Sequence, residues 1–261
     1  MVRTILFTLA LAGAAGAAEL PGPGDRVLPC RPTVACTAEI SAPGQLEWEA
    51  GFQHKVGLGS RVESTPLLLK LSLTENFQLQ LGTGGLTVVS GDAPASFFDA
   101  SQVLGKLSFP LGEGRPTIGA TAAVNLPTAT LDRKRTDALF AVLVSQDVIG
   151  FHYDFNAGLN LLAVDAAAQV QGWAALSISH DLPLDLTGMI EGWHSTAAGA
   201  LADRDGGFLF AAGWSPLPWV CFDVGGDVAL FADGRRFSVF AGVTSAVADL
   251  WGGPARRLAA R

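Results

Sequence analysis

Charged residues are scarce in this chain of 261 residues. Asp, Glu, Lys and Arg make up 16% of it, whereas hydrophobic residues make up 49%. Ordinary soluble domains carry about 25% charged residues, so the chain has few charges with which to cover a water-facing surface. The acidic excess, 24 acidic against 17 basic residues, also argues against a nucleic-acid partner, which would require a basic face.

Long apolar runs are lacking as well. Beyond the N-terminus no stretch of about 18 apolar residues occurs, which excludes membrane-spanning helices. The N-terminal residues 1–18 combine Arg3, an apolar run from Ile5 to Leu11, and small residues up to Ala18. This pattern predicts a cleaved secretory signal peptide, the alternative being a buried N-terminal helix.

Cysteine is sparse, with three residues in the chain. Cys30 and Cys36 lie in a Pro-rich leader, residues 19–44, and are candidates for a disulfide in an exported protein. A metal site there would need more ligands than this segment offers. The leader either folds into the rest of the protein or hangs in the periplasm; we assign it to the periplasm, although the sequence does not decide between the two.

What the chain does contain is strand after strand of period two. In HYDFNAGLNLLA, which starts at His152, Asp154 and Asn156 share one parity while Phe155 and Leu159 share the other. Three strands fall near residues 46–58, 64–74 and 77–89. Nine more are predicted at 101–111, 116–127, 137–148, 151–163, 170–182, 184–194, 207–215, 219–231 and 236–247. Most are longer than the usual five or six residues of globular strands, as tilted membrane-spanning strands are.

The predicted architecture is therefore all-β: a transmembrane antiparallel barrel of about 12 strands in an up-and-down meander. The barrel spans residues 45–248, and a C-terminal tail covers 249–261. Short connections (TEN, GEGRP, QDVIG, DLPLDL, SPLP) alternate with longer ones (SGDAPASFFDA, NLPTATLDRKRTD, AVDAAAQ, HSTAAGALADRDGG). Outer-membrane barrels place short turns in the periplasm. The first and last connections, GSRVE and ADGRR, depart from this alternation.

Tryptophan near strand ends is typical of the aromatic girdles of membrane barrels. Trp48, Trp193, Trp214, Trp219 and Trp251 lie at such positions, although the parity of Trp193 and Trp219 is uncertain and scattered core Trp is the alternative.

Parity predicts which side chains line the lumen. The candidate lining and solute path consists of Glu49, Gln53, Lys55, Lys70, Gln80, Lys106, Asn125, Asp154, Asn156, Asn160, Glu191, Asp223, Asp227 and Arg236. Such charges must be paired or hydrated. They could order water and guide a small solute, or form a network that merely fills the interior. A barrel of about 12 strands lies between filled eight-stranded barrels and open porins, so we expect a narrow, partly plugged passage.

Signals for catalysis are missing. The chain has four His residues, no nucleophile elbow, no phosphate loop and no paired metal-ligand motif. GTGG at residues 82–85 resembles a strand bend or bulge more than a phosphate loop, since no helix follows it. We predict no enzyme, cofactor or metal site. His152 and Asp154 are the one pair that a mutational test of catalysis should address.

Three segments carry a family resemblance: NLPTATLDRKRTD, FHYDFNAGLNLL and WAALSISHDLPLDLTGMIEGW. A strand ending in Leu-Pro-Thr, an Asp/Asn-bearing strand with Gly-Leu, and a later strand with Glu191 resemble the outer-membrane transporters grouped as the phenol-degradation MetA-pathway family. The resemblance covers residues 67–247. It implies an outer-membrane barrel that admits small, often aromatic or hydrophobic compounds, and it brings no catalytic residues.

The sequence thus predicts a passive outer-membrane channel or transporter in a Gram-negative bacterium, with membrane lipid and a small solute as partners and no protein partner assigned. One alternative is a non-transporting structural or surface-interaction barrel. The other is a secreted soluble β-domain, in which the Tyr/Phe/Leu faces would form a core instead of meeting lipid.

Overall fold

The computed structural model describes residues 26–57, 59–131, 135–164, 167–199, 202–230 and 236–251. The predicted signal peptide, residues 1–18, lies outside the described residues, as do residues 19–25 of the leader and 252–261 of the tail. The described residues contain no helix long and apolar enough to cross a membrane.

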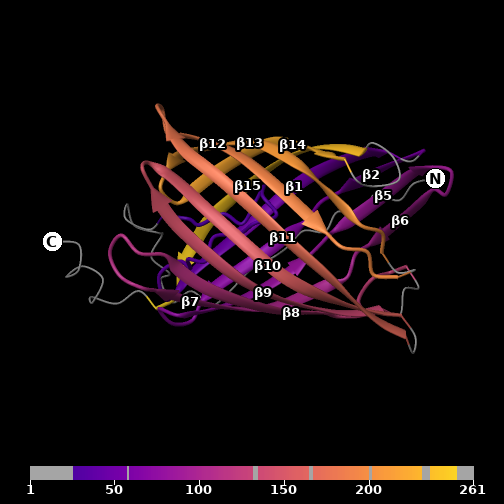
Figure 1. The fold of residues 1–261 in the computed structure, drawn as a ribbon, viewed down its shortest axis with the longest axis horizontal. Coiled ribbons are helices and arrows are strands. Elements are labelled where there is room, and N and C mark those ends of the chain that lie inside the picture. The colour runs from indigo at the N-terminus through magenta and orange to yellow at the C-terminus, as the bar shows by residue number, and fades with distance from the viewer. Residues whose placement is uncertain are drawn as a thin grey trace.

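All of the regular structure is antiparallel sheet (Figure 1). The strands are β1 (Gln45–Gly57), β2 (Ser60–Ser64), β3 (Leu67–Ser72), β4 (Phe77–Thr83), β5 (Leu86–Gly91), β6 (Ala95–Phe98), β7 (Ser101–Pro110), β8 (Thr117–Asn125), β9 (Arg135–Val148), β10 (Phe151–Val164), β11 (Ala167–Leu182), β12 (Leu186–Ser195), β13 (Asp205–Leu217), β14 (Val220–Ala229) and β15 (Arg236–Asp249).

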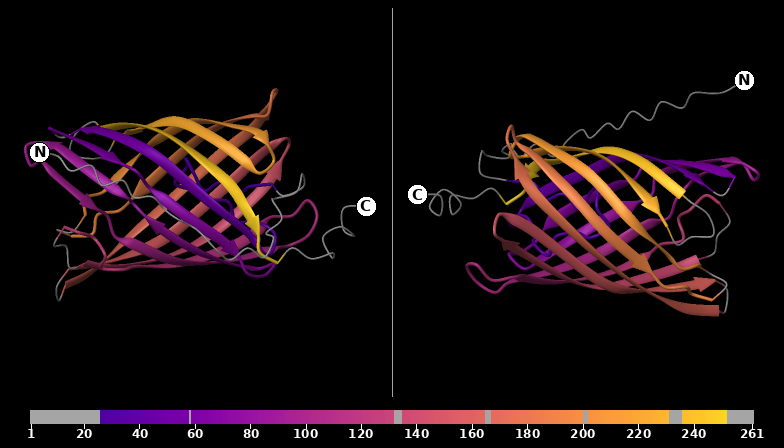
Figure 2. Two further views of the ribbon diagram at one scale, coloured as in Figure 1. Left: turned by 180° about the vertical axis from the view of Figure 1, so that it is seen from behind. Right: turned by 45° about the horizontal axis from the view of Figure 1, so that its top comes forward.

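The sheet closes on itself, because β15 pairs with β1 from Gln45↔Asp249 to Val56↔Phe237. The closed ring runs through β1, β3, β4 and β7 to β15 in chain order, each strand bonded to the next. This confirms the predicted barrel of 12 strands. Closure satisfies the edge groups that an open sheet would leave unpaired, and Figure 2 shows the wall from two further directions.

Three strands of the ring continue past a break. β2, β5 and β6 extend β3, β4 and β7 and project from the right-hand end of the barrel in Figure 1. The breaks are adjacent: Thr65 N–H donates to the Leu86 carbonyl, and Asp99 N–H donates to the Gly85 carbonyl. Gly85 has φ +69°, a conformation that favours glycine. The GTGG stretch is thus the bend that the sequence predicted, and β2 occupies what was predicted to be a connection.

The connections separate into two ends. Residues 73–76, 111–116, 149–150, 183–185 and 218–219 join strands at one end, which we call the short-turn end. The long connections 126–134 and 196–204 lie at the opposite, long-loop end. Two predicted loops were wrong: most of SGDAPASFFDA is β5 and β6, and most of AVDAAAQ is β10 and β11, joined at residues 165–166. Alanine is a weak strand former whose preference depends on its neighbours in the sheet, so the Ala-rich composition of AVDAAAQ did not reveal the strands.

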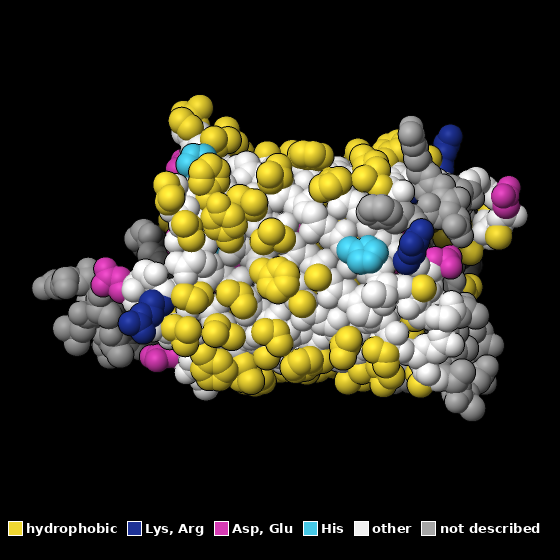
Figure 3. Space-filling model, viewed as in Figure 1, with side chains coloured by type: hydrophobic (Ala, Val, Ile, Leu, Met, Phe, Trp, Pro, Cys, Tyr) yellow, Lys and Arg dark blue, Asp and Glu magenta, His cyan; other side chains and the backbone are white. Residues whose placement is uncertain are grey.

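The two faces of the wall differ in polarity. On the face shown in Figure 3, apolar side chains cover the middle of the barrel, while Lys, Arg, Asp and Glu lie toward its two ends. Outward residues are exposed, with Leu159 at 53% and Phe210 at 61%. The largest fully buried side chains are instead polar and face inward: Lys70, Gln45, Glu47, Glu49, Thr244 and Ser72. The interior of this protein is therefore its polar lumen.

Tryptophan is distributed less symmetrically than predicted. Trp214 and Trp251 are exposed at the short-turn end, where Trp219 also lies. Trp193 shares the inward parity of the buried Glu191 and lines an internal cavity together with Trp173. The placement of Trp193 in a girdle was wrong, because strand parity outweighs its position near a strand end.

The leader also differs from its predicted place. Its described part, residues 26–43, does not hang below the barrel but lies inside it, and we call it the inserted segment. Val27 N–H donates to the Pro218 carbonyl, and Gly44 N–H donates to that of Ser72, so both of its ends lie at the short-turn end. Between them the segment reaches up to the middle of the lumen. Inward-facing side chains of the barrel form hydrogen bonds with the backbone N–H and C=O groups of this segment, which would otherwise need water as their partner.

Candidate functional site

A buried ionic cluster holds the start of the inserted segment. Lys70 Nζ on β3 lies 2.6 Å from Glu47 Oε2 and 2.7 Å from Glu49 Oε1, both on the adjacent strand β1. It also donates to the Leu28 carbonyl at 2.6 Å. Glu49 Oε1 in turn accepts the Cys30 N–H at 2.9 Å. All three charged side chains are buried, so their pairing compensates the loss of water.

Glu191 on β12 binds the far side of the segment. Its carboxylate accepts the Val34 N–H at 2.9 Å and the Ala35 N–H at 2.7 Å. These two bonds join positions 157 and 156 residues apart in the chain. Hydrogen bonds from amides to a charged acceptor are the stronger kind, which makes Glu191 a principal anchor.

A third anchor lies on β9 and β10. Ser145 Oγ accepts the Ala38 N–H at 2.6 Å and donates to Asp154 Oδ1. Asp154 is also 3.1 Å from His152 Nε2, whose Nδ1 lies 2.7 Å from Asp147. The Ser hydroxyl therefore meets the carboxylate and not the imidazole. A nucleophilic triad needs the His beside the Ser. Here Ser145 and His152 both bind Asp154, so the three residues do not have the order of a triad.

The tip of the inserted segment is a disulfide loop. Cys30 and Cys36 are bonded to each other, and Lys106 Nζ lies 3.6 Å from Cys36 Sγ. Arg31 is 3.6 Å from Asp223 on β14 and donates to the Ala241 carbonyl on β15 at 3.4 Å. The loop thus contacts β7 through Lys106, β14 through Asp223 and β15 through the Ala241 carbonyl.

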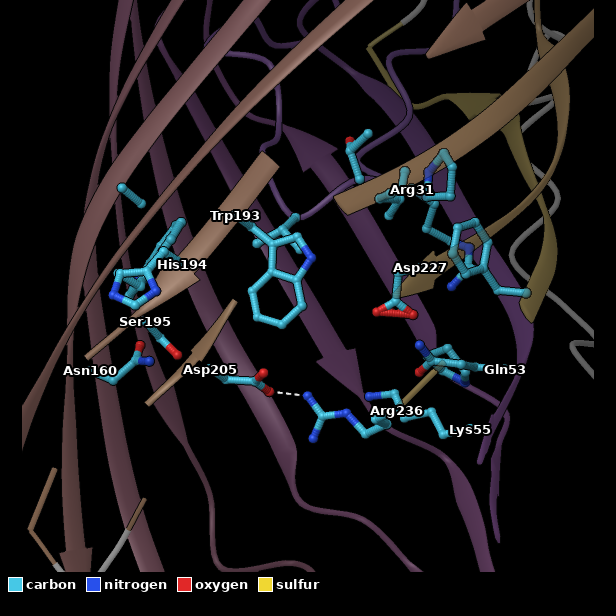
Figure 4. Close-up of a pocket in the computed structure, with 18 of the residues that line it drawn as sticks. Arg31, Gln53, Lys55, Asn160, Trp193, His194, Ser195, Asp205, Asp227 and Arg236 are labelled. Atoms are coloured by element: carbon cyan, nitrogen blue, oxygen red, sulfur yellow. Dashed lines mark hydrogen bonds and ion pairs between the residues drawn. The ribbon is translucent and has the colours of Figure 1, made fainter. Parts of the chain in front are cut away.

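Above the loop, toward the long-loop end, lies a cavity of about 770 Å³ that we call the vestibule. The inserted segment contributes Arg31 and Val34 to its lining. The wall contributes Gln53, Lys55, Leu139, Asn160, Gln171, Trp173, Trp193, Ser195, Asp205, Leu209, Asp227, Arg236 and Phe240. In Figure 4, Lys55, Gln53, Asp227 and Arg236 lie on one side of Trp193, and Asn160 and Ser195 lie on the other.

Several polar groups of the vestibule are hydrogen-bonded. Arg236 donates to Asp205, and Ser238 donates to Asp227. Asn160 Nδ2 donates to Gln171 Oε1 at 3.1 Å. These pairs are the satisfied state expected of polar groups shielded from bulk water.

The predicted lining residues fall into separate groups. Glu49, Lys70, Lys106, Glu191 and Asp223 contact the inserted segment directly, and Asp154 does so through Ser145. Gln80 donates to Gln78, which donates to Ser41 of the segment. Gln53, Lys55, Asn160, Asp227 and Arg236 line the vestibule. Asn125 lines a smaller cavity of about 180 Å³ beside Asn160, and Asn156 is buried in the wall.

Sequence reasoning missed Arg31, Trp173, Trp193 and Asp205, which also line the vestibule. Trp173 has the parity of Gln171 and Ser177, a signal that could have placed it inward. Asp205 was assigned to a loop, and Arg31 belongs to a segment with no periodicity. Among the described residues no group of His, Cys, Asp and Glu could hold a metal ion.

Comparison with known proteins identifies the fold through solved structures. No family model and no curated protein matches the chain. The COG4313 outer membrane channel from Pseudomonas putida F1 has a TM-score of 0.62 at 15% identity and covers 87% of this chain and 99% of its own. The NanC porin has a TM-score of 0.58 at 10% identity, with 76% and 100% covered. The KdgM porin in complex with disordered oligogalacturonate has 0.52 at 9%, with 76% and 98% covered.

At these low identities the structural similarity shows a shared barrel fold and no more. Membership in the phenol-degradation MetA-pathway family stays a prediction, since no family model matches.

Proposed function

We propose that the protein is an outer-membrane channel that passes small molecules without an energy source. The observation that carries this proposal is the division of the closed barrel into an apolar outside and a charged, hydrogen-bonded inside. Only a wall that meets lipid on one face and water or polar groups on the other requires this order of polarity.

The exposed apolar belt supports placement in a membrane. Phe210, Val224 and Leu159 are all more than half exposed on the outer face. A water-soluble β-domain would leave this belt in contact with water, at a cost that scales with its apolar area. Short turns face the periplasm in known outer-membrane barrels, so we assign the long-loop end, and with it the vestibule, to the cell exterior.

The inserted segment determines how a solute would pass. The vestibule is bounded below by the disulfide loop, and the anchors at Lys70, Glu191 and Ser145 occupy the lumen beneath it. A solute that enters from outside therefore meets the segment at mid-barrel. Passage requires the segment to shift toward the short-turn end, where both of its ends lie.

Hydrophobic or aromatic solutes are the class that we favour. Trp173, Trp193, Leu209 and Phe240 give the vestibule apolar surface on several strands. Aromatic side chains offer a large apolar area and favour other flat rings. The polar side chains between them keep the cavity wettable, which small amphipathic molecules tolerate.

Liposome swelling tests the proposal. The chain without its signal peptide is reconstituted beside a variant that lacks residues 19–43, and a gel of boiled and unboiled samples verifies that both barrels are folded. We expect slow swelling with small neutral solutes for the first protein and much faster swelling for the second, because the truncation removes the inserted segment.

If both folded proteins leave the liposomes sealed, the channel proposal is wrong. A non-transporting structural barrel would then be favoured, since the many contacts of the inserted segment would serve stability alone. Should the truncated chain not fold, Glu191→Gln replaces it, because this variant keeps the segment and weakens one anchor.

A further inference from the structure

One cation in the vestibule, Lys55, has no ion-pair partner among the residues that the structure describes. Lys55 projects inward from β1 and is half-buried. The other two cations there are paired, Arg31 with Asp223 and Arg236 with Asp205. Across the residues that the structure describes, no hydrogen bond or ion pair reaches Lys55 Nζ. A half-buried ammonium group forms its strongest hydrogen bonds with an anionic partner. Affinity is lost least when the water that this partner displaces is poorly ordered.

The carboxylates of the vestibule are already engaged. Asp205 accepts from Arg236, and Asp227 accepts from the Ser238 hydroxyl. The charge of Arg236 repels the Lys55 ammonium and that of Asp227 attracts it, but Asp227 and Lys55 do not form an ion pair within the described residues. The lining carries the cations Arg31, Lys55 and Arg236 against the carboxylates of Asp205 and Asp227. Because the Lys55 ammonium keeps its hydrogen-bonding capacity, it is the group in this lining to which an added carboxylate can bind.

A flat apolar wall forms another part of the lining of the same cavity. Trp173 and Trp193 come from the paired strands β11 and β12, where the register opposes Trp173 to Ser195 and Ala175 to Trp193. The two rings are thus diagonal neighbours on the inner face. Gly158 leaves room for the Trp173 ring, since a side chain there would meet it at 2.9 Å. Figure 4 shows Trp193 between the Lys55 side of the cavity and the Asn160 side.

We propose that the vestibule binds a small organic monoanion, with its carboxylate at Lys55 and a flat apolar body against Trp193. The cavity volume, about 770 Å³, lies within the range of small-molecule sites, which is roughly 300–1,000 Å³. This inference rests on the vestibule being the mouth of the proposed channel. It adds to that proposal a charge requirement and the residues that impose it.

Binding to the detergent-solubilised full chain tests the charge requirement. Isothermal titration with benzoate is compared with benzyl alcohol, which has a similar ring and no charge, and with benzyltrimethylammonium, which has the opposite charge. We expect benzoate to bind and the other two to bind at least about tenfold more weakly. Equal binding of benzyl alcohol, tighter binding of the ammonium probe, or no benzoate binding at millimolar concentration overturns the proposal.

Matched variants locate the site. Lys55→Met removes the proposed anchor, while Arg61→Gln removes a positive charge from the exposed neighbouring strand β2, outside the lining of the vestibule. Benzoate affinity should fall about tenfold or more in the first and stay within about twofold in the second. Equal losses in both would show a general field effect and refute a specific role of Lys55.

A second pair of variants tests the aromatic wall. Trp193→Leu should weaken benzoate binding several-fold, whereas Trp214→Leu, on the outer face, should leave it unchanged. If Trp193→Leu has no effect, the ring does not lie against Trp193. Binding in detergent does not require passage, so sealed liposomes together with intact benzoate binding would refute the channel and leave this site standing. Swelling without benzoate binding would refute this site and leave the channel proposal standing.

Discussion

Glu191→Gln is the sharpest test of how the inserted segment is held. The carboxylate is 2% exposed and accepts the Val34 and Ala35 amides at 2.9 and 2.7 Å. The amide of Gln has nearly the same shape but a single acceptor oxygen, so its NH2 group must face one of the two N–H donors. The variant therefore loses one charged hydrogen bond and sets a donor against a donor.

The magnitude follows from the strength of such bonds. A hydrogen bond to a charged group contributes about 1.5–3 kcal/mol, and about 1.4 kcal/mol corresponds to a factor of ten. Neutralising the buried carboxylate recovers part of this through lower desolvation. We expect the population with the segment undocked to rise at least about tenfold.

Hydrogen exchange measured by mass spectrometry in detergent micelles reads this population directly. The amides of residues 34 and 35 should lose about tenfold protection in Glu191→Gln, and single-channel recordings should show more frequent openings. Glu75→Gln, in the exposed turn between β3 and β4, is the control and should leave both unchanged. Unaltered protection at residues 34 and 35 would refute the role of Glu191 as an anchor.

Three further substitutions test other parts of the structure. Lys70→Met leaves Glu47 and Glu49 in the lumen without a counter-charge. It should lower the free energy of unfolding by about 3–5 kcal/mol, measured as a lower urea midpoint in vesicles, and a midpoint equal to wild type contradicts the ionic cluster. Gly158→Leu places a side chain against the Phe140 carbonyl oxygen and the Trp173 ring and should cost about 1–3 kcal/mol in the same assay. It should also alter near-ultraviolet circular dichroism, and an unchanged spectrum would show that the Trp173 ring does not move to admit the side chain. Leu159→Arg should reduce folding into vesicles by about 2–4 kcal/mol because this side chain faces lipid; Asn160→Arg, one position along and facing the lumen, is the control, and equal effects of the two would refute the assigned faces.

Much of the wall was predictable from residue order alone. Period-two alternation is local, since successive side chains of any strand point to opposite faces. The faces of Glu49, Lys70 and Leu159 could therefore be assigned without knowing which strands are neighbours. The alternation also indicates 12 strands, and low charge indicates that the apolar face meets something other than water.

Two predictions were wrong because a local sequence pattern pointed to one structure and the surrounding strands imposed another. Trp193 was grouped with girdle residues because it lies near a strand end, although it has the parity of Glu191. The AVDAAAQ stretch was assigned to a loop because small residues carry little strand signal. For Trp193 the parity of β12 decided the outcome, and for AVDAAAQ it was the hydrogen-bonded register of β10 and β11, which runs from Phe151↔His180 to Val164↔Ala167.

The sequence by itself determined the two faces of the strands, their approximate number, and the bend at GTGG. Only the tertiary structure decided what fills the lumen. The inserted segment has no period from which to read its path, and its bonds to Glu191 connect residues 157 and 156 positions apart. Those contacts exist because ring closure brings distant inward groups around one narrow space, where unpaired amides and charges must find each other.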